Sequence, residues 1–219
     1  MPVILSIDAG ADGYSAAIIR DGTVIAEFTR PQSRGAAEPM IPLIDQVLHA
    51  SGLRLDQIDA IAAASGPGSF TGIRVALAAA HGLGAVKNIP TYGISAFAAM
   101  AAMIPHTARQ NMWTMIALHS GKGDFYTAMF DADLKMVQPA TTQKNIQRQS
   151  ITIGRGVIAG SAALEASAAI SDAAIYDLPS PLFLAAGAGV YLHKHWNDRA
   201  QFLPTPNYMR DADVTMAAG

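Results

Sequence analysis

Short apolar runs alternate with turn-forming residues at the start of the chain. Val3–Ile7, Ser15–Ile19 and Thr23–Thr29 have the length and apolar content of strands. Asp21-Gly22, between the second and third runs, is a strong hairpin signal. We therefore expect the chain to open with an antiparallel meander of three strands.

A helical period replaces the strand pattern after this meander. Pro39–Ala50 carries apolar residues at i, i+3 and i+4 spacing. Pro39 suits a first helical turn, and Pro42 lies within four residues of that start. Strands and helices then alternate, which predicts an α/β layer. The expected elements are strands at Ile58–Ser65 and Ile89–Ile94, and helices at Thr71–Val86 and Ala96–Met103.

The second half repeats the opening pattern. When the second half is aligned with the first meander without gaps, Asp8 matches His119 and Tyr14 matches Phe125, which is an offset of 111 residues. We interpret this as an internal duplication, and a chance likeness of two meanders is the alternative. The expected elements here are strands at Trp113–Leu118, Phe125–Phe130, Thr152–Ala159 and Ala173–Tyr176, and helices at Ser161–Ser171 and Pro181–His195.

The low charge content changes this picture of an ordinary α/β domain. Only 15% of the 219 residues are charged, against about 25% in an average domain. So few charges predict an apolar patch on the surface, which usually marks a partner site. The net charge of −2 provides no basic field for nucleic acid. The chain has no cysteine, no membrane-spanning apolar stretch and no signal-like start, so we expect a cytoplasmic protein.

A glycine-rich segment, SGPGSFTGIR, joins a predicted strand to a predicted helix at residues 65–74. Its glycines permit positive φ and close backbone approach, and Ser69 and Thr71 are candidate N-caps. One interpretation is an anion site at the helix start, with Arg74 as a further contact. The other, which composition favours, is a tight turn in which Arg74 pairs with a nearby Asp.

Asp8 ends the first predicted strand and precedes a loop that contains Gly10 and Gly13. Its carboxylate would suit a hydrated Mg²⁺ beside a phosphate, whereas the alternative is a turn-initiating Asp. A phosphotransferase built from two such hairpins would need a second acidic group, but the offset brings His119 there. ATP hydrolysis by this chain alone is therefore not expected. The histidines lack the i, i+4 spacing of a zinc pair, so nothing supports a zinc peptidase.

The helix after the glycine-rich segment carries small residues on one face. Ala76, Ala80 and Gly84 recur every four residues, beside a stripe of Ile73 and Leu77. Small side chains let another helix approach closely. With the bulkier face of the preceding helix they predict a docking surface, while the alternative is that both faces cover the sheet. The two interpretations are compatible, because these stripes occupy only part of the helix circumference. The bulkier residues are Met40, Ile44, Val47 and Leu48.

The glycine-rich segment resembles the signature of the TsaB family, also called YeaZ. Its signature residues are Gly66, Gly68, Ser69, Phe70, Thr71, Gly72 and Arg74. ILSIDAGADGYSAAI resembles the family's opening strand and loop, EPMIPLIDQVL its first helix, IPTYGIS the strand after the signature helix, and PNYMR its closing Pro-x-Tyr-x-Arg. The resemblance covers Met1 to about Met103 well, and the second half in outline.

The resemblance implies an actin-like, Hsp70-like ATPase fold of two ribonuclease-H-like subdomains. We place these at residues 1–105 and 106–219, with the tail packing back on the first. It also implies a non-catalytic subunit that binds a TsaD-like subunit and supports threonylcarbamoyl transfer to the tRNA adenosine beside the anticodon. Docking would use the two helices described above, a TsaE-like ATPase would join, and the chain alone would form homodimers.

The resemblance also bears on cofactors and catalysis. TsaD carries a metal site on an H-x-x-x-H helix, and this chain lacks that motif, so we expect no metal site. ATP or ADP with Mg²⁺ would lie at the partner interface, with Asp8, Gly10 and His119 as the candidate cleft residues, and tRNA would be contacted only indirectly. The alternative function is an independent ATP-dependent phosphotransferase or ATPase of the same fold.

Two departures from the family pattern affect these expectations. Arg34-Gly35-Ala36-Ala37 stands where the family often has His, and His119-Ser120-Gly121 stands where it often has Asp-Ala-Arg. The second departure removes a carboxylate and an arginine from the cleft, which weakens nucleotide handling more than docking. From the small-residue face we expect Ala80→Arg to break the heterodimer and to leave the monomer folded.

Overall fold

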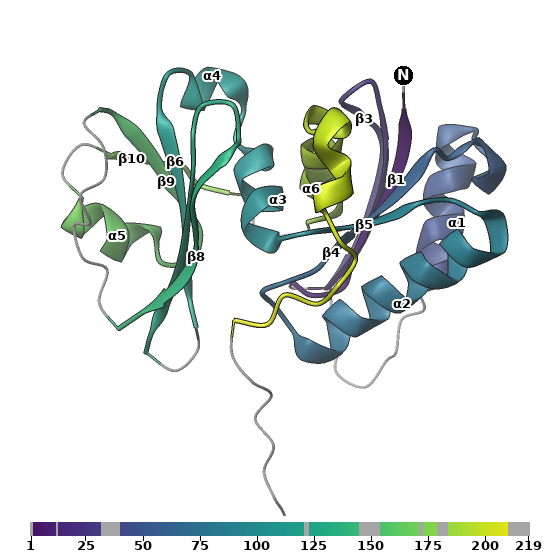
Figure 1. Ribbon diagram of the computed structural model, residues 1–219, viewed down its shortest axis with the longest axis horizontal. Coiled ribbons are helices and arrows are strands. Elements are labelled where there is room, and N and C mark those ends of the chain that lie inside the picture. The colour runs from purple at the N-terminus through teal and green to yellow at the C-terminus, as the bar shows by residue number, and fades with distance from the viewer. Residues whose placement is uncertain are drawn as a thin grey trace, which may run out of the picture.

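Two five-stranded sheets form the framework of the protein in the computed structural model (Figure 1). The structure describes residues 2–11, 13–31, 40–120, 123–144, 154–170, 173–178 and 184–209. The first sheet has the order β3-β2-β1-β4-β5 and the second the order β8-β7-β6-β9-β10. The strands are β1 Val3–Asp8, β2 Gly13–Arg20, β3 Thr23–Pro31, β4 Ala60–Ala64, β5 Thr91–Ile94, β6 Trp113–His119, β7 Phe125–Phe130, β8 Met136–Gln143, β9 Gly156–Ala159 and β10 Ala173–Ile175.

The two sheets have the same topology, as an internal duplication predicts. In each sheet an antiparallel meander of three strands is followed by two strands that join in parallel. A chance likeness of two meanders would not extend to the parallel strands, so the shared order favours duplication. The sequence pattern missed β8, because half of the residues in MVQPATTQ are polar and the segment contains a proline, as an edge strand can.

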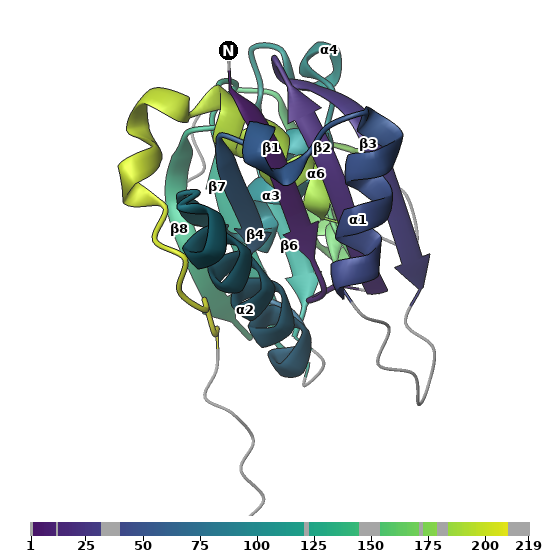
Figure 2. The same cartoon turned by 90° about the vertical axis from the view of Figure 1, so that its right-hand side faces the viewer.

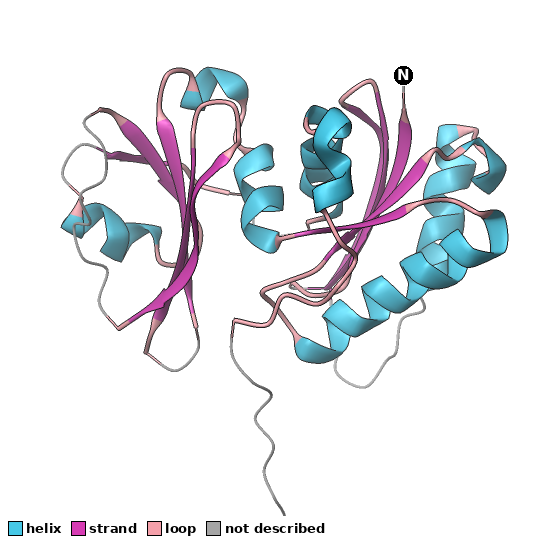
Figure 3. Ribbon diagram, in the orientation of Figure 1, coloured by secondary structure: helices cyan, strands magenta, loops and turns pink. Residues whose placement is uncertain are grey.

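Helices lie on both faces of the first sheet and on both faces of the second, which gives five layers (Figure 3). The outer face of the first sheet is covered by α1 and α2, and the outer face of the second by α5, while α3 and α6 lie between the sheets. The helices are α1 Met40–Ser51, α2 Phe70–Lys87, α3 Ala96–Met103, α4 His106–Arg109, α5 Ala163–Ala169 and α6 Ala185–Lys194, with 3-10 turns at Leu55–Gln57 and Trp196–Gln201.

The layer between the sheets explains part of the low charge content. All side chains of α3 from Ala96 to Ala101 are buried, so this helix is apolar on every side. A Cβ on Gly187 would lie 2.2 Å from the carbonyl oxygen of Ala99, which means that α3 and α6 touch through their backbones. The two helices of this central layer are made mostly of small apolar residues: α3 has no charged residue, and α6 has one, Lys194 at its end.

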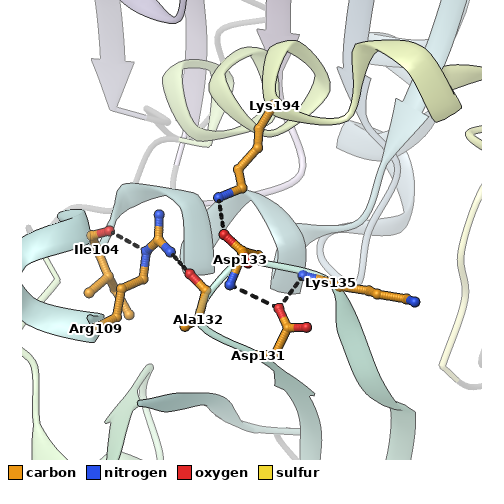
Figure 4. A network of polar contacts seen from close by, with 7 residues as sticks. All are labelled: Ile104, Arg109, Asp131, Ala132, Asp133, Lys135 and Lys194. Atoms are coloured by element: carbon orange, nitrogen blue, oxygen red, sulfur yellow. Dashed lines mark hydrogen bonds and ion pairs between the residues drawn. The ribbon is translucent and has the colours of Figure 1, made fainter. Parts of the chain in front are cut away.

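Helix α6 joins the two halves of the molecule. The chain reaches it from β10 of the second sheet, but α6 packs on the inner face of the first sheet, where a Cβ on Gly189 would lie 2.2 Å from Ile19. At its other end Lys194 Nζ lies 3.2 Å from Asp133 Oδ1 in the β7–β8 turn (Figure 4). The expected division at residues 105 and 106 stays a prediction.

The β7–β8 turn is held from both sides. Asp131 Oδ1 accepts hydrogen bonds from the N–H groups of Asp133 and Lys135, each at 2.9 Å. The buried guanidinium of Arg109 donates to the carbonyl oxygen of Ile104 at 3.1 Å and to that of Ala132 in the turn (Figure 4). These contacts fix the turn to which α6 is tied.

Candidate functional site

The glycine-rich segment turns the chain from β4 into α2, and several of its polar groups form hydrogen bonds within the chain. Ser69 caps α2: its Oγ accepts from the N–H of Gly72 at 3.3 Å, and its carbonyl accepts from the N–H of Ile73 at 2.9 Å. The N–H of Ser69 donates to the carbonyl of Gly10 at 2.7 Å. Thr71, the other N-cap candidate, lies inside the helix.

The glycines of this segment allow it to pack closely against the loop that follows β1. A Cβ on Gly68 would lie 2.2 Å from the carbonyl oxygen of Gly10, and one on Gly72 would lie 1.7 Å from that of Ala9. Real Cβ atoms do not approach so closely, so both positions require glycine whether or not a ligand binds. The tight-turn interpretation therefore accounts for the segment better than the anion site does.

Arg74 pairs with aromatic side chains, and the expected Asp partner was wrong. Its Nε donates to the hydroxyl of Tyr208 at 3.1 Å, and its guanidinium carbon lies 3.8 Å from the centre of the Phe70 ring. The rings of Phe70 and Tyr208 stack with their centroids 5.0 Å apart. This cluster, Phe70, Arg74 and Tyr208, joins the first turns of α2 to the C-terminal segment. Arg210, the last residue of PNYMR, lies outside the described residues.

Asp8 is fully buried beneath the start of α6. Its Oδ1 accepts from the N–H of Gly10 at 2.9 Å, while Oδ2 has no partner among the described residues. Nearby, the hydroxyl of Ser15 accepts from the N–H of Ala185 at 3.1 Å. Burial raises the pKa of Asp8 from 3.8 to about 6, and backbone N–H groups, those of Gly10 and Leu184 first, offset part of the rise.

His119 lies on the opposite face of its strand from the one expected. Its Nε2 is 3.1 Å from Glu165 Oε1 on α5, on the same face as Ala117. Asp8 faces the central layer with Ile4, so the residue of β6 on the matching face is Leu118. A slip of one residue exchanges the two faces of a strand. The ungapped offset was therefore wrong for β6, and it does not bring His119 to the position of Asp8. The same offset of 111 residues matches Gly10 to Gly121, which lies outside the described residues.

These positions do not fit a nucleotide with Mg²⁺ held by this chain alone. The carboxylate of Asp8 is enclosed, and the N–H groups of Ser69 and Gly72 are used internally. His119 faces α5, and the described residues include no cluster of three or more His, Asp or Glu side chains placed to hold a metal ion. Among the described helices, none has the length and apolar content to cross a membrane.

The residues expected to dock a partner lie in the core of the monomer. All but one are buried against the first sheet, and Leu48 is partly buried there. Gly84 is needed within the chain, since its Cβ would lie 2.6 Å from Thr91 and 2.7 Å from the carbonyl of Ile89. The alternative that these faces cover the sheet is correct for this set: Met40, Ile44, Val47, Leu48, Ile73, Ala76, Leu77, Ala80 and Gly84.

Sequence reasoning missed the outward face of the same two helices, which Figure 2 presents toward the viewer. A ridge of exposed residues follows α2 at four-residue spacing, with Val86 79% exposed at its end. On α1, Ile41 is 54% exposed. The i, i+4 spacing was visible in the sequence, but it competed with an equally regular apolar stripe that faces the sheet. The ridge is Phe70, Arg74, Ala78, Gly82 and Val86.

The strand order and the layers define an actin-like ATPase-fold protein of two ribonuclease-H-like halves. Component A of the (R)-2-hydroxyglutaryl-CoA dehydratase of Acidaminococcus fermentans has a similar fold, with a TM-score of 0.54 at 12% identity over 89% of this chain and 98% of that one. A Pseudomonas aeruginosa protein described as similar to peptidase YeaZ gives a TM-score of 0.77 at 19% identity, over 96% of this chain and 100% of that one.

Sequence comparison narrows the class to a family. The family model described as TsaD, tRNA N6-adenosine threonylcarbamoyltransferase, matches residues 23–218. The TsaB protein of Escherichia coli is 30% identical over 168 residues, covering 70% of this chain and 71% of the relative. The TsaB protein of Haemophilus influenzae is 31% identical over 212 residues, covering 88% of this chain and 87% of the relative. Both carry the description tRNA threonylcarbamoyladenosine biosynthesis protein. The chain belongs to the TsaB (YeaZ) family.

Proposed function

We propose that this chain is a partner subunit in the formation of N6-threonylcarbamoyladenosine in tRNA, and that it binds a TsaD-type subunit. The TsaB relatives named for this biosynthesis, and the match to the TsaD family model, support the role. The internal use of the signature segment supports a subunit that contributes a surface rather than a reaction site. We assign it no catalytic residue.

The observation that carries the docking proposal is the exposed ridge of α2, and Gly82 in particular. A Cβ added to Gly82 would meet nothing within 4 Å, so the fold of this chain does not require glycine there. Glycine inside a helix costs about 1 kcal/mol relative to alanine. A partner helix that crosses the ridge at Ala78 and Gly82 would explain the residue, because small side chains permit close crossing.

The proposal extends to nucleotide, tRNA and location. We place ATP or ADP with Mg²⁺, where the complex uses it, at the partner interface, because Asp8 and the signature segment are occupied by their own chain. Contact with tRNA falls mainly to other subunits, since the net charge of this chain is −2. We expect a TsaE-like ATPase to be the third component of the complex and the complex to act in the cytoplasm. Without a partner subunit, we expect this chain to form a homodimer through the α1–α2 face.

Size-exclusion chromatography with a purified TsaD-type subunit tests the docking proposal. Ala78→Arg places a long charged side chain on the ridge and is expected to abolish co-elution while the chain stays folded. Ala168→Arg is the matched control, because Ala168 is exposed on α5 at the other end of the molecule. Ala80→Arg is unsuitable, since Ala80 is fully buried and its replacement would unfold the monomer. Unchanged co-elution of Ala78→Arg would refute docking through this face.

A further inference from the structure

The C-terminal segment Phe202–Met209, called the strap from here on, is tied to the first sheet along its length. It has no helix or strand of its own, yet Figure 1 shows it running from the end of α6 past β4 and β5 toward the start of α2. The N–H of Gly93, in β5, donates to the carbonyl of Phe202 at 3.2 Å. The N–H of Asn207 donates to the carbonyl of Ser65, just after β4, at 2.7 Å.

Two glycines of the first half make room for the strap. A Cβ on Gly93 would lie 2.5 Å from the carbonyl oxygen of Leu203, and one on Gly66 would lie 2.7 Å from that of Asn207. Gly66 also has a φ of +103°, which side chains rarely adopt. Gly66, the first glycine of the signature segment, therefore leaves the space that the chain's own C-terminal segment occupies.

The strap ends on the ridge proposed for docking. Tyr208 contributes its hydroxyl to Arg74 and its ring to Phe70, and Arg74 also lies over that ring. Phe70 and Tyr208 each remain 38% exposed, and Arg74 is exposed as well. Arginine and tyrosine are among the residues that dominate binding energy at protein interfaces. Ala78, which is also exposed, follows Arg74 one turn further along α2.

We infer that the strap is part of the docking surface: Tyr208 holds Arg74 and Phe70 in place and itself contacts the TsaD-type partner. This inference rests on the proposed function. An unrestrained arginine loses rotamer entropy when a partner immobilises it, whereas the stacked Arg74 is already ordered before binding. Such pre-organisation raises affinity by reducing the entropy lost on association.

Titration calorimetry with the purified TsaD-type subunit tests this inference. Tyr208→Ala is expected to weaken binding at least tenfold, because it removes the ring and the hydroxyl together. Tyr208→Phe keeps the stack and is expected to lose about threefold or less. Leu203→Ala is the control, since Leu203 is 66% exposed at the far end of the strap and is expected to bind like the wild type.

A second variant, on the other side of the Arg74–Tyr208 contact, separates a loss of binding from an effect of the Tyr208 substitution on folding. Arg74→Lys loses the planar guanidinium that stacks on Phe70, and it is expected to weaken binding by a similar factor, with an unchanged circular dichroism spectrum. Wild-type affinity in both Tyr208→Ala and Arg74→Lys would overturn the strap inference and leave the proposed function standing. A wild-type chain that does not bind would overturn both.

Discussion

Replacement of Asp8 by asparagine should change how the stability of this protein depends on pH. The side chain is fully buried, and its Oδ2 has no hydrogen-bond partner among the described residues. No charged side chain contributes to its shifted pKa, which follows from burial and from neighbouring backbone N–H groups. Asp8→Asn keeps the shape of the carboxylate and removes its charge.

The magnitude follows from the pKa of this carboxyl. It rises from 3.8 to about 6 on folding, so the folded chain binds the proton more tightly than the unfolded chain does. The resulting stabilisation is complete below pH 3.8 and is lost as the pH rises through about 6. One pKa unit corresponds to about 1.4 kcal/mol, so the whole loss is about 3 kcal/mol, of which about 1.4 kcal/mol falls between pH 5 and pH 7.5.

Urea unfolding of both proteins at pH 5 and at pH 7.5 measures this difference. The wild type should lose about 1.4 kcal/mol more than Asp8→Asn between the two pH values, and the variant should be the more stable at pH 7.5. Asp45→Asn, on the exposed side of α1, is expected to follow the wild type. Equal pH dependence in the wild type and Asp8→Asn would refute the assignment of Asp8 as a buried, destabilised carboxylate.

Three further predictions concern stability and can be read from urea unfolding at neutral pH. Gly72→Ala should destabilise the protein by about 3 kcal/mol or more, because its Cβ would lie 1.7 Å from the carbonyl oxygen of Ala9. Gly82→Ala should stabilise it by about 0.5–1 kcal/mol, because its Cβ would meet nothing within 4 Å. The reverse order of stability would contradict the packing described. Arg109→Met should cost about 2–4 kcal/mol, since it leaves two carbonyl groups unpaired, and a neutral result would argue against that role. Lys194→Met should change stability by less than about 1 kcal/mol, because Asp133 is 86% exposed, and a larger loss would show that this ion pair matters more than its exposure suggests.

The arrangement of the fold could be predicted from sequence because its elements repeat. The hairpin signal at Asp21-Gly22 and the periodicity of the first helix located elements that the structure confirms within a few residues. The repeated meander predicted two similar halves, and the two sheets share one strand order. The offset failed at β6 because a match of strands without gaps cannot detect a shift of one residue, and that shift turned His119 toward α5.

The site could be predicted only in part, because both faces of α2 have regular patterns. Ala76 and Ala80 formed the more conspicuous stripe, and it faces the sheet. Ala78 and Gly82 form the other stripe, and only the structure shows that nothing in this chain covers Gly82. The contact of Arg74 with Tyr208 joins residues 134 positions apart, and no local pattern predicts a contact at that separation.

Reconstitution of the tRNA modification tests the central claim most directly. Unmodified tRNA is incubated with ATP, a threonylcarbamoyl donor, a TsaD-type subunit and a TsaE-type ATPase, with and without this chain, and the nucleosides are quantified by mass spectrometry. N6-threonylcarbamoyladenosine should form only when this chain is present, and Ala78→Arg should fail where Ala168→Arg succeeds. The same yield with and without the chain would contradict its role as the partner subunit.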